Sequence, residues 1–83
     1  MAEIYQLGDD LDALNRKRSK LEYEEYKFEG NAENTIEGQI IVDGKKEELV
    51  KAGFDVVILM TRESMYIWSR KTKPQDRNSI YEY

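Results

Sequence analysis

The chain has 83 residues, 40% of them hydrophobic and 36% charged, and it contains neither cysteine nor histidine. This length allows one small domain, and the missing residue types exclude disulfides, thiolate metal sites and the usual general base near neutral pH. The net charge is −4, with 7 basic and 13 acidic residues in 1–50 but 6 and 4 in 51–83. Such a balance is not typical of general nucleic-acid binders, which carry a clear positive excess.

A heptad-like stripe of apolar residues runs through the first third of the chain. The spacing alternates between three and four, with Arg18 and Glu25 in its two gaps. Its apolar members are Ile4, Leu7, Leu11, Leu14, Leu21 and Phe28. This period predicts a long amphipathic helix from about Asp9 or Asp10 to Tyr26 or Lys27, with Asp9 as N-cap.

An alternative stays open for residues 21–29. The aromatic residues Tyr23, Tyr26 and Phe28 favour a strand there. Such a strand would pair with the next one across residues 30–34.

The middle of the chain predicts a strand followed by a short helix. Ile36, Ile40 and Val42 lie within the predicted strand, Thr35–Val42, whose central Gly38 indicates a bulge or the close approach of another group. Asp43 is placed to cap a short helix over about residues 44–52, and Gly53 to terminate it.

The run from Phe54 to Arg70 predicts a β-hairpin around a polar turn at residues 61–64. Counting outward from that turn gives four facing pairs: Met60 with Met65, Leu59 with Tyr66, Val57 with Trp68, and Asp55 with Arg70. Since side chains alternate along a strand, the hairpin has two apolar faces.

The aromatic face of this hairpin is the main candidate for a binding surface. If it is exposed, the partner-binding residues are Val57, Leu59, Tyr66, Trp68 and Arg70. Tyrosine and tryptophan suit a protein hot spot or a stacked base. The competing interpretation is that the first helix covers this face and makes it core.

Other motifs have ordinary explanations. Asp9, Asp10 and Asp12 lack the spacing of a calcium loop and fit a helix start. Gly38 and Gly44 are one residue too far apart for a phosphate loop. The basic run at residues 16–20 is followed by glutamates and fits a solvated helix face. We therefore expect no catalytic residue, no metal site and no cofactor.

The order of strand, short lysine–glutamate helix, Gly53-Phe54-Asp55-Val56 and hairpin, in a small, charged, cysteine-free chain, resembles the accessory proteins encoded in bacteriophage genomes. Many of these act by binding a host protein. The resemblance implies a host factor or a host defence protein as the target.

Together these patterns predict an α+β fold. A long N-terminal amphipathic helix packs on a small three-stranded sheet of uncertain strand order, with a short helix between strands one and two and a C-terminal β-hairpin. Residues 1–70 form the single domain, and residues 71–83 a polar, flexible tail.

The expected function is a non-enzymatic, cytoplasmic protein-binding module: an inhibitor, adaptor or small regulatory subunit without a membrane segment. Self-association through the heptad-like stripe is the simplest version, with Arg18 pairing with Glu25 across the seam. The alternative is a nucleic-acid or nucleotide binder that uses the aromatic face and the basic C-terminal end. Its residues are Tyr66, Trp68, Arg62, Arg70, Lys71, Lys73 and Arg77.

Overall fold

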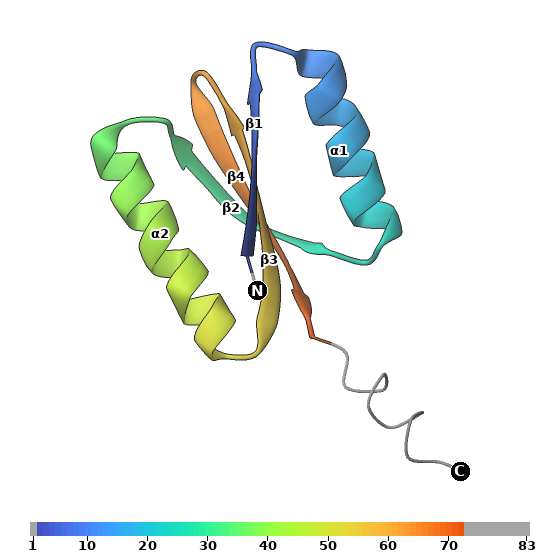
Figure 1. Cartoon of the computed structure of the whole chain (residues 1–83), viewed down its shortest axis with the longest axis vertical. Coiled ribbons are helices and arrows are strands. Elements are labelled where there is room, and N and C mark those ends of the chain that lie inside the picture. Colours follow the sequence, from blue (N-terminus) through green and yellow to red (C-terminus); the bar gives the residue numbers. More distant parts are fainter. Residues whose placement is uncertain (1, 73–83) are drawn as a thin grey trace.

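The computed structural model describes residues 2–72. Its elements, in chain order, are β1 (Ala2–Gly8), α1 (Leu11–Tyr23), β2 (Lys27–Glu33), α2 (Ile36–Lys51), β3 (Phe54–Thr61) and β4 (Ser64–Lys71). The four strands form one mixed sheet in the order β1-β3-β4-β2, in which β1 runs parallel to β3 and the other neighbouring pairs are antiparallel. Figure 1 shows the two helices on opposite sides of this sheet, so the domain has three layers.

The predicted fold of a long N-terminal helix on a three-stranded sheet is wrong. The sheet has four strands, and the heptad-like stripe passes from β1 through α1 into β2 instead of lying along one helix. The backbone breaks the helical path at both ends of α1, because Gly8 and Glu25 have φ angles of 61° and 69°. A right-handed helix cannot continue through such residues.

Helix α1 is therefore shorter than predicted, with 13 residues. Its N-cap is Asp10 and not Asp9: the Asp10 carboxylate accepts a hydrogen bond from the Ala13 N–H at 3.0 Å. Residues 21–23 belong to α1 and residues 27–29 to β2, so each interpretation of this stretch describes part of it. The alternative paired this strand with the next strand along the chain. In the structure β2 pairs instead with β4, about 40 residues later.

The strand predicted for Thr35–Val42 is also wrong, because α2 already begins at Ile36. Thr35 caps this helix: its Oγ1 accepts a hydrogen bond from the Gly38 N–H at 3.0 Å. The expected helix over residues 44–52 is the second half of α2, and Gly53 follows it with a φ angle of 91°. Such a left-handed glycine is a common helix terminator.

The hairpin is confirmed, including its register. Met60 pairs with Met65, Leu59 with Tyr66, Val57 with Trp68, and Asp55 with Arg70. Thr61 Oγ1 closes the turn, because it accepts from the Ser64 N–H and donates to the Ser64 carbonyl. Local turn geometry sets the register of a hairpin, which is why counting from the turn succeeded.

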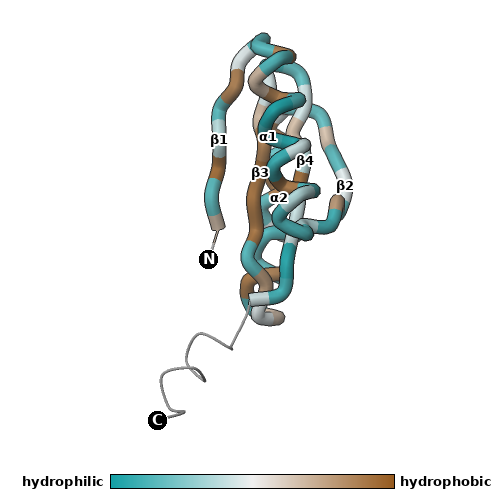
Figure 2. The backbone as a smooth tube through the Cα atoms, turned by 90° about the vertical axis from the view of Figure 1, so that its right-hand side faces the viewer, coloured by the Kyte–Doolittle hydropathy of each residue, from teal (hydrophilic) through white to brown (hydrophobic). Residues whose placement is uncertain are grey.

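Two apolar clusters lie on the two faces of the sheet. On the α2 side, the buried residues are Val42, Leu49, Val56, Ile58, Met65 and Ile67. On the α1 side they are Leu14, Leu21, Val57, Leu59 and Trp68. Figure 2 shows β3 as the most continuously hydrophobic strand, lying between the edge strands β1 and β2.

The boundary expected between the domain and the tail, at residue 70, lies one residue before the end of β4 at Lys71. The rest of the expected tail, residues 73–83, lies outside the described residues. Neither helix among residues 2–72 is long and apolar enough to cross a membrane.

Gly38 lies in the first turn of α2, where the helix is close to the backbone at the end of β2. A methyl group at Gly38 would overlap the backbone carbonyl of Glu33, whereas one at Gly44 in the same helix would meet open space. We expect Gly38→Ala to lower the free energy of unfolding by about 2–3 kcal/mol through overpacking. Gly44→Ala should raise it by about 0.5–1 kcal/mol, because alanine favours helices. Urea titrations followed by circular dichroism would measure both, and equal effects of the two substitutions would contradict this close approach.

Candidate functional site

The residues predicted to bind a partner lie under and beside α1. Val57, Leu59 and Trp68 are at most 4% exposed and pack against Leu14 and Leu21. Tyr66 and Arg70 are half-buried at the border of this cluster. The structure therefore brings the five residues to one face of the sheet, but helix α1 covers three of them.

The Arg70 side chain is engaged within the domain. Its Nη1 donates a hydrogen bond to the Glu24 carbonyl at 2.9 Å, and its guanidinium lies 4.4 Å from the centre of the Tyr26 ring. Burial raises the pKa of the Tyr26 phenol, and the nearby Arg70 charge partly offsets that rise. Arg70 thus joins β4 to the segment between α1 and β2.

The alternative hypothesis of a nucleic-acid or nucleotide binder also named other basic residues, and those that the structure describes do not gather around Trp68. Arg62 lies in the turn between β3 and β4, is largely exposed, and contacts Asp9 at 3.5 Å. Lys71 is exposed at the end of β4. Lys73 and Arg77 lie outside the described residues.

An aromatic groove of about 520 Å³ lies between α1 and β2, where α1 does not cover the sheet. It is lined by Arg18, Glu22, Tyr26, Phe28, Asn31, Tyr66 and Trp68. The Phe28 and Trp68 rings pack with their centres 5.1 Å apart. The indole N–H of Trp68 is buried without a hydrogen-bond partner among the described residues. One arginine and one glutamate line this groove, so it has no net charge to attract an anion.

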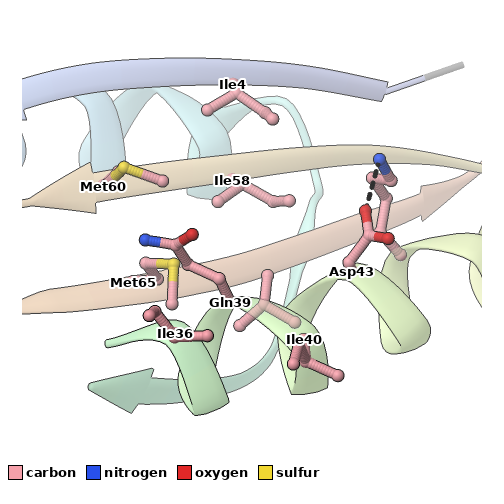
Figure 3. Close-up of a pocket in the computed structure, with 10 residues that line it drawn as sticks. Ile4, Ile36, Gln39, Ile40, Asp43, Ile58, Met60 and Met65 are labelled. Atoms are coloured by element: carbon pink, nitrogen blue, oxygen red, sulfur yellow. Dashed lines mark ion pairs between the residues drawn. The ribbon is translucent and has the colours of Figure 1, made fainter. Parts of the chain in front are cut away.

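A second, aliphatic groove of about 370 Å³ lies on the other face, between β1 and α2. We define it by six apolar residues that line it: Ile4, Ile36, Ile40, Ile58, Met60 and Met65. Figure 3 shows Ile4 on β1 along one side, Ile36 and Ile40 on α2 along the other, and Ile58 on the strand between them. The groove exists because α2 packs mainly on β2, β3 and β4 and leaves β1 uncovered.

The isoleucines that form the two walls of the aliphatic groove are exposed to solvent. Ile36, Ile40 and Ile4 are 79%, 67% and 51% exposed. Isolated exposed apolar residues are ordinary, but a contiguous group over a groove is typical of a surface that binds something. The charged residues among those that line it are Asp43 and Lys46, which pair with each other at 2.9 Å.

Strand β1 adds an open backbone edge to this groove. Among the described strands β1 pairs with β3 alone, so one side of its backbone has no partner there. The N–H and C=O groups of such an edge can accept a further strand. Unpaired backbone groups and apolar side chains therefore lie next to each other.

Sequence reasoning missed Ile36 and Ile40 because it assigned them to a strand. Two local signals could have found the helix: Thr35 at an N-cap position, and Glu37 in the first turn. The spacing of four between Ile36 and Ile40 then puts both on one helix face.

The described residues contain no group of three or more acidic side chains that could hold a metal ion. The two grooves offer apolar contact, ring stacking and, along β1, backbone hydrogen bonds. No protein-family model matches the chain, and no curated protein or solved structure matches it either.

The burial of Trp68 can be tested against the exposure of Ile40. We expect Trp68→Ala to cost about 3–5 kcal/mol of folding stability, because it would leave a large cavity under α1. Ile40→Ala should change stability by less than about 0.5 kcal/mol, since the side chain is mostly in water. Urea unfolding monitored by far-ultraviolet circular dichroism compares the two. A Trp68→Ala protein as stable as the wild type would show that the indole is not part of the core.

Proposed function

We propose that the chain is a cytoplasmic, non-enzymatic protein-binding module that docks through the aliphatic groove and the open edge of β1. It would act as an inhibitor, adaptor or small regulatory subunit. The observation that carries the proposal is that exposed isoleucines flank this groove on both sides, Ile4 on β1 and Ile36 and Ile40 on α2, next to a β1 edge that no other described strand pairs.

The energetics support a protein partner. Complete burial of one isoleucine side chain contributes about 1.5–3 kcal/mol, so three largely exposed ones offer several kcal/mol toward the cost of association. Backbone pairing along β1 would add orientation, because strand addition fixes the direction and register of the bound segment. The resemblance to bacteriophage accessory proteins is consistent with a host protein in this role.

A random peptide display library tests the proposal and does not require the partner to be identified first. Peptides selected on the wild-type domain should be rich in apolar and β-branched residues, and Ile36→Lys should weaken their binding at least about 10-fold, which is about 1.4 kcal/mol. Calorimetric titration would measure the affinities.

Tyr23→Lys is the matched control, because Tyr23 is also a large exposed side chain, 89% exposed, but lies at the end of α1. If the selected peptides bind the Ile36→Lys variant as tightly as they bind the wild type, the docking surface is not the aliphatic groove.

The aromatic groove favours a second candidate function, the binding of a nucleotide or a single-stranded nucleic acid. Tyr26, Phe28, Tyr66 and Trp68 line it together, and aromatic side chains stack on bases at about 1–3 kcal/mol per base. Arg18 on α1 also lines this groove and supplies a cation there.

Trp68 is the single tryptophan of the chain, so its fluorescence reports directly on this groove. If bases stack there, nucleotides or short oligonucleotides should change the emission, and Tyr66→Ala should reduce the effect. Oligonucleotide affinity should also fall as salt is added, because phosphate contacts release counterions. Unchanged emission at about 1 mM nucleotide, a concentration that detects even weak binding, would remove this candidate.

A further inference from the structure

The aromatic groove has an aromatic floor and a charged wall. Phe28 on β2 and Tyr66 and Trp68 on β4 belong to the floor, because they lie on the face of the sheet that α1 only partly covers. Phe28 is 45% exposed, so part of this floor is open to a ligand. Arg18 and Glu22 line the groove from α1. A flat ring that stacks on the floor therefore presents its edge to the two charged side chains.

These two charged side chains are not engaged elsewhere in the domain. Arg18 and Glu22 are four positions apart on α1, where side chains are neighbours at about 5–6 Å between Cβ atoms. Within residues 2–72 neither side chain makes an ion pair or a hydrogen bond. The charged pair at the aliphatic groove, Asp43 and Lys46, is by contrast closed at 2.9 Å. The aromatic groove thus offers a carboxylate acceptor and a guanidinium donor side by side.

Among the nucleic-acid bases, guanine matches this pair of groups. One of its edges carries two adjacent donors, N1–H and the N2 amino group, and a carboxylate can accept from both. The neighbouring edge carries two acceptors, O6 and N7, which an arginine contacts bidentately. Adenine, cytosine and uracil have no two adjacent donors. Guanine alone can therefore use both oxygens of Glu22 and the fork of Arg18 at the same time.

We propose that the aromatic groove binds the guanine base of a mononucleotide, with Glu22 on the N1–H and N2 edge and Arg18 on the O6 and N7 edge. This inference rests on the second candidate function, because it names the base that the same groove recognises. The groove volume of about 520 Å³ lies within the range of small-ligand sites, about 300–1,000 Å³.

The charge balance favours a mononucleotide over a longer strand. The groove has one positive and one negative side chain, and the whole chain carries a net charge of −4. The affinity of an oligonucleotide depends largely on phosphate contacts, which such a surface does not favour. Recognition of a single base depends instead on stacking and on the hydrogen bonds of its edges.

Calorimetric titration with GMP, AMP, CMP and UMP tests the identity of the base. We expect GMP to bind at least about 10-fold more tightly than each of the others, because guanine alone makes both bidentate contacts. IMP differs from GMP only in lacking the 2-amino group. It should therefore bind at least about 5-fold more weakly than GMP. Equal affinities for GMP and IMP would overturn the contact with Glu22.

The substitution Glu22→Gln tests the carboxylate directly. An amide has one acceptor oxygen in place of two, so this variant should lose the preference for GMP over IMP. Glu24→Gln is the matched control, because the Glu24 side chain lines a depression on the β1 side of α1. This control should keep the wild-type preference. A preference that survives in Glu22→Gln, or that is lost equally in both variants, would overturn the proposal.

The substitution Arg18→Ala tests the other edge of the base. The wild type should bind the 7-deaza analogue of GMP, which has a carbon in place of N7, more weakly than GMP itself. Arg18→Ala should bind both nucleotides weakly and with equal affinity. An undiminished preference for GMP over the analogue in this variant would overturn the contact with Arg18.

The outcomes separate guanine recognition from the second candidate function. Equal binding of all four mononucleotides would refute guanine recognition and retain nucleotide binding. No binding of any nucleotide or oligonucleotide at about 1 mM would refute both. Binding of a short oligonucleotide without binding of GMP would refute the mononucleotide and identify a single-stranded nucleic acid as the ligand. Selective binding of GMP that is lost in Glu22→Gln and kept in Glu24→Gln would establish the guanine base as the ligand.

Discussion

The burial of β3 on both faces is the constraint on which the rest of this structure depends. Val56, Val57, Ile58 and Leu59 are each at most 3% exposed, and alternate residues contact opposite apolar clusters. A strand with two apolar faces must be central in its sheet and covered by a layer on each side. The parallel strand β1, the hairpin partner β4 and the two helices all satisfy that requirement.

Two helices are too few to cover a four-stranded sheet completely. Helix α1 packs on β1 and β3, and helix α2 packs on β2, β3 and β4, so each leaves a different part of the sheet uncovered. The two grooves follow directly, one aromatic beside β2 and one aliphatic beside β1. The differing chemistry of these grooves comes from the alternation of side chains along β4, where Met65 faces α2 and Tyr66 faces α1. The aliphatic groove combines exposed side chains with a β1 edge that pairs with no second strand within residues 2–72, which is why we favour it as the docking surface.

The sequence left open whether the face with Trp68 is a binding surface or is covered by the first helix. In the structure Leu14 and Leu21 of α1 lie on this face and cover Trp68. Sequence reasoning could not identify Ile36 and Ile40 as groove residues, because that required knowing that they lie on a helix and that β1 lies beside them. The role of Val57, Leu59, Tyr66, Trp68 and Arg70 in partner binding stays a prediction.

Taken alone, the sequence determined what depends on near neighbours: the hairpin, its register from Met60–Met65 to Asp55–Arg70, and the termination of α2 by Gly53. These features are encoded within a few residues, so turn chemistry and alternation suffice to predict them. Tertiary structure decided whether Ala2–Gly8 and Lys27–Glu33 became strands, because their partners, β3 and β4, lie tens of residues away. The heptad-like stripe shows the physical reason: its period favours a helix locally, but the cooperative pairing of strands and the burial of β3 stabilise the sheet instead.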